Sequence, residues 1–200
     1  AYPLRQISLM KEIMKEELQK AVQVLRSGGV ILYPTDTVWG IGCDATNPEA
    51  VAKVFEIKRR QDSKSLVLLA GDMDMICRYV KEIPEMAIQL VEVNDKPMTI
   101  IYPQGVNLAD NVTAEDGSIA IRIPKCRFCV DMIRKFGKPI ISTSANVSGE
   151  KAPKKFEEIS SAIKEKIDYM VDSKMDTEST GKPSSIVKLG LNFEVKIIRD

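Results

Sequence analysis

The 200-residue chain contains no histidine, and this absence excludes two large classes of catalytic site. Ser-His-Asp and Cys-His arrangements both need an imidazole to take the proton of the nucleophile. Histidine is also the commonest general base near neutral pH. Any reaction that the chain catalyses must therefore depend on other side chains.

The chain has only four cysteines, too few and too scattered for a structural zinc site. Cys43 and Cys77 are isolated, whereas Cys126 and Cys129 form a single Cys-x-x-Cys. A structural zinc ion needs four ligands, usually two such pairs or one pair with added histidines. We expect buried or bystander thiols, with a redox pair at Cys126 and Cys129 as the weaker alternative. No metal ligand is predicted.

The sequence also lacks a large excess of either charge and a long apolar run. The formal net charge is +1, which does not imply a general electrostatic attraction to nucleic acid, so any basic site must be a local cluster. No run approaches the roughly 20 apolar residues of a membrane span, and the charged N-terminal segment lacks the apolar core of a signal peptide. We expect a cytoplasmic protein without membrane contact. Residues 1–9 are either an extension of the domain or an artificial remnant.

What is present is an alternation of helical and extended patterns, which is typical of an α/β domain. We expect one domain over residues 1–200, because no linker or internal repeat interrupts it. The predicted helices cover about 10–27, 48–58, 72–80, 84–93, 127–136 and 156–167. The predicted strands cover 30–33, 65–69, 98–102, 119–123 and 139–141, followed by a hairpin of 185–189 with 193–198.

One glycine-containing pattern resembles a nucleotide-binding motif without matching it. Gly40-x-Gly42-x-x-Ala45 imitates a dinucleotide fingerprint, but that motif joins a strand directly to a helix, and the next predicted helix begins only near Pro48. The glycines are interpreted as permitting a tight bend. No Gly-x-x-x-x-Gly-Lys-Ser/Thr is present, which argues against a P-loop enzyme.

Three polar motifs stand at the ends of predicted elements, where α/β proteins collect their ligand sites. Thr35-Asp36-Thr37 follows the first strand, Lys58-Arg59-Arg60 ends a helix, and Ser144-Ala145-Asn146 follows an apolar strand. Each has an ordinary alternative, such as a turn or the cationic last turn of a helix. Together they suit an anion, for which a nucleotide phosphate is the first candidate.

These motifs also carry a family resemblance. The segment 29–43, Gly-Val-Ile-Leu-Tyr-Pro-Thr-Asp-Thr-Val-Trp-Gly-Ile-Gly-Cys, resembles the opening of the YrdC family of L-threonylcarbamoyladenylate synthases. The Lys-x-Arg of the family falls at Lys58 and Arg60, and its Ser-x-Asn falls at Ser144 and Asn146. The order and spacing fit from about residue 12 to the end of the chain.

The resemblance implies a twisted, open, mixed β-sheet flanked by helices around a concave basic cleft. It implies the synthesis of threonylcarbamoyl-AMP from L-threonine, bicarbonate and ATP with release of pyrophosphate, the first step of threonylcarbamoyl-adenosine modification of tRNA. Mg²⁺ is expected with ATP, and a separate threonylcarbamoyl transferase is the expected downstream partner.

The resemblance also assigns roles to individual residues. The phosphate ligands, and the only residues with a catalytic role, would be Lys58 and Arg60. ATP would further contact Ser118, Ser144, Asn146 and Arg199. Threonine would contact Thr35, Arg122 and Ser184.

The chain departs from the family pattern at a few positions, and two alternative functions stay open. Gln61 and Ser65 stand where the family has prolines, and Asp95-Lys96-Pro97 replaces its Pro-Gly-Pro. One alternative is a module that binds double-stranded RNA or tRNA in the basic cleft. The other is a YrdC-like paralogue with a different carbamoyl acceptor.

Overall fold

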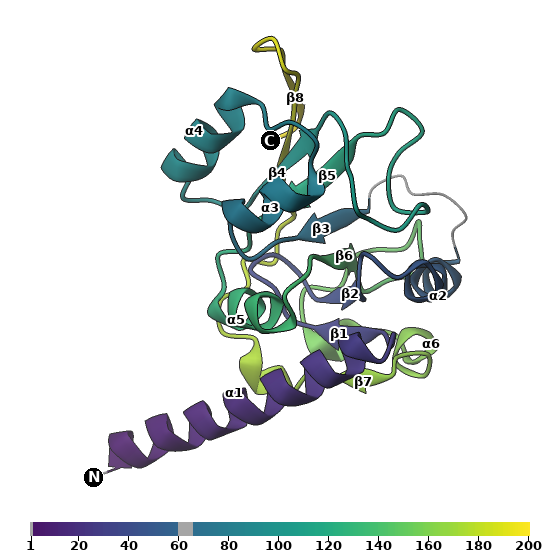
Figure 1. The fold of residues 1–200 in the computed structure, drawn as a ribbon. Helices are drawn as coiled ribbons and strands as arrows, with labels where there is room; N and C mark the ends of the chain where they lie inside the picture. Colours follow the sequence, from purple (N-terminus) through teal and green to yellow (C-terminus); the bar gives the residue numbers. More distant parts are fainter. Residues whose placement is uncertain (1, 60–65) are drawn as a thin grey trace.

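The computed structural model describes residues 2–59 and 66–200, in which nine strands form one continuous mixed sheet (Figure 1). The strand order is β7-β1-β2-β6-β3-β5-β4-β8-β9. The pairs β1–β7, β3–β5 and β4–β8 are parallel, and the other neighbouring pairs are antiparallel. Helices flank the sheet (Figure 1). The predicted α/β class with a mixed, helix-flanked sheet is therefore confirmed.

The elements have the following bounds. The strands are β1 (Ile31–Tyr33), β2 (Gly40–Gly42), β3 (Val67–Leu69), β4 (Met98–Tyr102), β5 (Ile119–Arg122), β6 (Ile140–Ser144), β7 (Tyr169–Met170), β8 (Ser185–Leu189) and β9 (Val195–Arg199). The α-helices are α1 (Tyr2–Arg26), α2 (Pro48–Lys58), α3 (Met73–Tyr79), α4 (Glu85–Val93), α5 (Arg127–Phe136) and α6 (Ser161–Lys164). Two 3₁₀ turns are η1 (Phe156–Glu158) and η2 (Ser173–Met175).

Local chemistry sets the ends of α2, the helix that carries the cationic motif. The side-chain oxygen of Asn47 accepts hydrogen bonds from the amides of Glu49 and Ala50 at 3.1 and 3.2 Å, and Pro48 occupies the first turn. The helix stops at Arg59, which adopts a left-handed backbone with φ 53°. Lys58 is thus the last helical residue, as its sequence position predicted.

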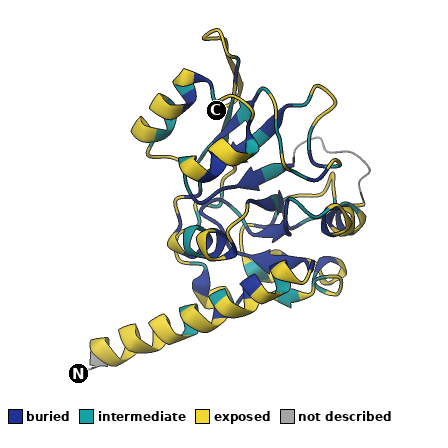
Figure 2. Ribbon diagram, in the orientation of Figure 1, coloured by how far each residue is buried: buried dark blue, intermediate teal, exposed yellow. Residues whose placement is uncertain are grey.

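The first helix is longer than predicted, since it begins at Tyr2 rather than near residue 10. Its C-terminal part packs on the sheet through Ala21, Val22 and Leu25, which are all buried. Its N-terminal part extends away from the sheet and is exposed (Figures 1 and 2). The helical spacing of apolar residues predicted the part of this helix from residue 10 onward but contained no signal for the extension.

Two other predictions need correction. The helix expected over 156–167 is broken into η1 and α6, because the backbone is extended at Ile159 and Ser160. Strand β7 was not predicted, since two residues are too short to show a periodic pattern. The C-terminal hairpin is confirmed as β8 and β9.

Gly40 and Gly42 do not form a bend but belong to β2, which corrects the interpretation from sequence. A Cβ atom on Gly42 would lie 2.6 Å from the carbonyl oxygen of Ile141 and 2.6 Å from a ring carbon of Tyr33. The Tyr33 hydroxyl donates to that same carbonyl at 3.1 Å. The absence of a side chain at Gly42 therefore leaves room for the buried ring of Tyr33.

The Cys-x-x-Cys pair lies in the core. Cys126 and Cys129 are free, buried thiols, and the Cys129 thiol donates to the carbonyl of Pro34 at 3.2 Å. Burial raises the pKa of Cys129, which disfavours the thiolate needed for redox or metal chemistry. Over residues 2–59 and 66–200, no group of three His, Cys, Asp or Glu side chains is placed to hold a metal ion. In the same ranges, no helix is long and apolar enough to cross a membrane.

The packing of β2 generates a prediction with a matched control. Gly42→Ala should lower the free energy of unfolding by about 1–3 kcal/mol, because the added methyl group overlaps a backbone carbonyl that cannot move easily. Gly40→Ala lies in the same strand, but its methyl group meets neighbours only at 3.5 Å, an ordinary contact. Thermal melting should show a drop of several degrees for Gly42→Ala alone. Equal melting temperatures for the two variants would contradict this packing.

Candidate functional site

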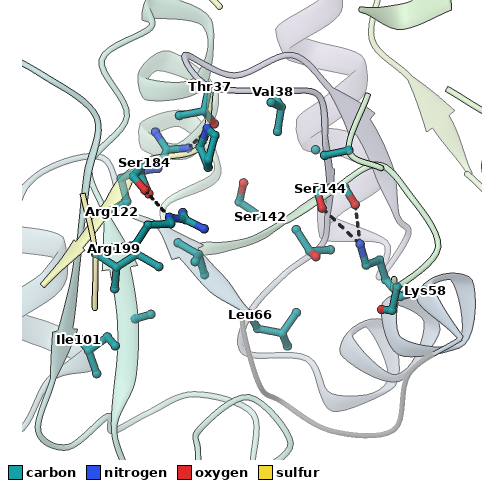
Figure 3. A pocket seen from close by; sticks show the side chains of 18 of the residues that line it. Thr37, Val38, Lys58, Leu66, Ile101, Arg122, Ser142, Ser144, Ser184 and Arg199 are labelled. Carbon is teal, nitrogen blue, oxygen red and sulfur yellow. Dashed lines mark hydrogen bonds between the residues drawn. The ribbon is translucent and has the colours of Figure 1, made fainter. Parts of the chain in front are cut away.

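A cavity of about 910 Å³ opens where loops and strand ends from distant parts of the chain meet (Figure 3). One wall carries the end of α2 and the end of β6 with its following loop. The opposite wall carries β5, the start of β8 and the end of β9. The loop after β1 closes one side.

Lys58 links the cationic motif at the end of α2 to the Ser-x-Asn motif at the end of β6. Its side chain is buried, with 2% of the residue exposed, and its ammonium group donates to the carbonyl of Ser144 at 2.7 Å. The same nitrogen lies 3.4 Å from the Ser144 hydroxyl and 3.4 Å from the side-chain oxygen of Asn146 (Figure 3). A cation at a helix end is thus held against neutral oxygen atoms of the Ser-x-Asn motif.

The Ser144 hydroxyl and the side-chain oxygen of Asn146 both face the Lys58 ammonium, while Ala145 between them is buried. The Asn146 amide donates to the carbonyls of Val147 and Glu150 at 3.0 and 2.8 Å. Asn146 therefore has two roles, since its amide nitrogen shapes the loop and its oxygen faces Lys58.

Arg122 lies in the opposite wall and is also buried. One terminal nitrogen of its guanidinium donates to a carboxylate oxygen of Asp36 in an ion pair, and the other donates to the Thr37 hydroxyl at 3.3 Å. The second oxygen of Asp36 accepts the amide of Lys125 at 2.9 Å. Arg122 is therefore held in one orientation at the cavity edge.

Thr35 and Thr37 lie at different places in the loop after β1. The Thr35 hydroxyl donates to the Val38 carbonyl at 2.7 Å, and accepts the Thr37 amide at 3.0 Å, so it organises the loop from within. Thr37, not Thr35, lines the cavity. The Thr-Asp-Thr motif offered two hydroxyls two positions apart, and only the structure distinguishes them.

Ser118, Ser184 and Arg199 complete the far wall. Hydrogen bonds from Ser118, the side-chain one above all, lower the pKa of Asp116. The Ser184 hydroxyl lies 2.7 Å from that of Thr99, and the Ser184 carbonyl accepts from Nε of Arg199 at 2.8 Å (Figure 3). Partial desolvation lowers the pKa of Arg199, although the residue as a whole is exposed.

The cavity therefore brings together most of the residues singled out from the sequence. Those that line it are Lys58, Ser118, Arg122, Ser144, Asn146, Ser184 and Arg199. Arg60, together with Gln61 and Ser65, lies outside the described residues. Thr37, Trp39 and Ser142 also line the cavity. Thr37 belongs to the Thr-Asp-Thr motif but was given no role from the sequence, and Trp39 and Ser142 were missed because neither carries a charge.

The charged side chains of the described lining are all cationic. They are Lys58, Arg122 and Arg199, and no aspartate or glutamate is among the lining residues that the structure describes. Asp36 lies behind Arg122 and balances part of its charge. The basic character of the cleft as a whole stays a prediction, but the charges described in its lining favour an anion.

Comparison with known proteins identifies the family. The Sua5/YciO/YrdC family model, described as "Telomere recombination", matches residues 23–200. The chain belongs to this family. The match begins inside α1 and includes every residue of the site described above.

Relatives of similar length carry an enzyme name. The chain is 34% identical over 180 residues to a threonylcarbamoyl-AMP synthase of Stenotrophomonas maltophilia, covering 88% of this chain and 94% of that protein. It is 32% identical over 174 residues to the threonylcarbamoyl-AMP synthase of Vibrio campbellii, covering 86% of this chain and 93% of that protein.

Solved structures of the Sua5/YciO/YrdC family share the fold. P. abyssi Sua5 complexed with L-threonine matches with a TM-score of 0.79 and 26% identity over 86% of this chain. The present chain spans 50% of that Sua5 chain. E. coli YciO matches with a TM-score of 0.79, and the match covers 94% of this chain and 89% of the YciO chain. At 22% identity, this likeness concerns the fold alone.

Proposed function

We propose that this chain synthesises L-threonylcarbamoyl-AMP from L-threonine, bicarbonate and ATP, with release of pyrophosphate. The observation that carries the proposal is the convergence of Lys58, Asn146 and Arg122 on one cavity. The names of the full-length relatives support it. The product would supply a separate transferase that modifies an adenosine of tRNA, and both this transferase and tRNA are part of the proposal.

The two walls suit two anions. We place the nucleotide phosphates beside Lys58, whose ammonium is a point charge, with Ser144 and Asn146 holding the adenylate. Ser118 and Arg199 would contact the nucleotide from the far wall. A threonine carboxylate fits Arg122, because a planar guanidinium can bind two oxygens at once. Ser184 and Thr37 would offer hydroxyls to the same amino acid.

The reaction needs little help from a general base, which fits a chain without histidine. Condensation of the threonine amine with bicarbonate gives a carbamate and releases water. A carbamate oxygen then attacks the α-phosphorus of ATP, and the bond to pyrophosphate breaks as the leaving group takes its electron pair. Because both reactants are anionic, the protein must align them and place positive charge at the phosphate oxygens. Lys58 supplies this charge from the described chain, and Arg60 is proposed as its second source.

Magnesium fits this scheme as part of the substrate. The described lining contains hydroxyl and amide oxygens but no carboxylate. A hard cation such as Mg²⁺ commonly binds substrate phosphates and keeps several waters, so we propose that it enters with ATP. When bound, it would neutralise phosphate charge.

The direct test is pyrophosphate release from MgATP, measured with and without each co-substrate. We expect release only when L-threonine and bicarbonate are both present, because the carbamate is the nucleophile. Omission of either should reduce the rate to background. Equal release with serine, or with no amino acid, would overturn the threonine claim and favour a paralogue with another acceptor. RNA binding without any such release would favour the RNA-binding module.

The orientation of the cationic motif gives a second prediction. Lys58→Ala should lower turnover by about 10²–10³-fold, the scale for one lost transition-state donor. Arg59→Ala removes the same charge from the next residue, which is exposed and does not line the cavity. Its turnover should stay within about two-fold of the unmodified protein. An equal loss in both variants would show that the motif acts only through its net charge.

A further inference from the structure

Arg122 and Asp36 form an ion pair in which each side chain is only 3% exposed. We propose that Asp36 is a positioning residue, which acts on threonine through Arg122 and never touches the substrate. This inference rests on the proposed function, in that Arg122 receives the threonine carboxylate. Asp36 itself does not line the cavity.

The carboxylate of Asp36 is fixed from two directions. One oxygen accepts from Arg122, and the other accepts the backbone amide of Lys125 at 2.9 Å. Its own backbone is anchored as well, because the Asp36 carbonyl accepts the amide of Thr180 at 3.0 Å. An acceptor held in this way defines where the guanidinium of Arg122 must lie.

The loop of Asp36 is tied to the segment that leads to β8. The Thr37 carbonyl accepts from the hydroxyl of Ser179 at 2.6 Å and from the amide of Gly181 at 2.8 Å. That segment continues to Ser184, which lines the same cavity. Asp36 therefore connects the Arg122 guanidinium to the loop after β1. This loop is in turn bonded to the segment that carries Ser184, the second proposed threonine contact.

Arg122 has five N–H groups, of which some donate to the protein and the others can donate to a ligand. Nη1 donates to Asp36 and Nη2 donates to Thr37, so the plane of the guanidinium is fixed. The donors that these two contacts do not use can serve an anion in the cavity. Without the carboxylate, a buried guanidinium would lose its partner and its orientation, which is costly in a desolvated wall.

The first test is Asp36→Asn, which keeps the shape of the side chain. An asparagine has one carbonyl oxygen, so it cannot accept from both Arg122 and the Lys125 amide without turning its NH₂ group toward a donor. We expect the KM for threonine to rise about 10- to 100-fold, comparable to the loss of an outer-shell partner of a metal ligand. The KM for ATP should change less than three-fold.

Asp44→Asn is the matched control. Asp44 is also buried, accepts from the amide and hydroxyl of Thr46 at 2.8 and 2.7 Å, and pairs with Lys138 at 3.6 Å. It does not line the cavity. A merely structural role predicts that both variants melt earlier and bind threonine equally well, and that result would overturn the proposal.

A double-mutant cycle makes the test independent of the stability of Asp36→Asn alone. If Asp36 acts only through Arg122, Arg122→Gln and the double variant with Asp36→Asn should have the same KM for threonine. A further rise of more than three-fold in the double variant would refute positioning. The unmodified protein serves as the separate check on function, because absence of threonine-dependent pyrophosphate release there would reject the proposed reaction itself.

Discussion

Strand β6 is the constraint on which the site depends. It pairs antiparallel with β2 on one side and with β3 on the other, and so joins the two halves of the nine-stranded sheet. Its last residue, Ser144, lies opposite Gly40 and accepts the ammonium of Lys58. The end of this strand therefore brings α2 and the loop after β1 to one cavity. A slip of one residue in its pairing would turn the polar groups away from Lys58.

The electrostatic design follows from this arrangement. The Lys58 ammonium donates to oxygen atoms of Ser144 and Asn146, and the Arg122 guanidinium pairs with the carboxylate of Asp36. The two cations occupy opposite walls of the cavity (Figure 3). An ammonium suits phosphate oxygens as a point charge, and an oriented guanidinium suits a carboxylate. Two anionic substrates that repel each other can then be held side by side, which is the main requirement of the proposed reaction.

The sequence predicted the fold class and most of the site because its strongest signals are local. Asn47 and Pro48 marked the start of α2, and the cationic residues at its end marked the site. The Ser-x-Asn motif marked the end of β6 and its following loop, where oxygen atoms of Ser144 and Asn146 contact Lys58. The family resemblance added Ser118, Ser184 and Arg199, which no spacing argument had suggested.

The remaining features depend on tertiary contacts that no local pattern records. Gly42 was interpreted as a bend because its real constraint, the ring of Tyr33, lies in another strand. The Thr35 hydroxyl turns into the loop to donate to the Val38 carbonyl, whereas Thr37 lines the cavity. The partnership of Asp36 with Arg122 joins residues 86 positions apart. Such contacts become visible only once the chain is folded.

The central claim is that one cavity holds both anionic substrates on opposite walls. A crystal structure of the protein with L-threonine and a non-reactive ATP analogue tests it most directly. The account predicts phosphate oxygens within hydrogen-bond distance of the Lys58 ammonium, and the threonine carboxylate on the guanidinium of Arg122. Ligand density confined to another basic region, such as the surface hollow beside Arg78, Lys81 and Lys138, would contradict it.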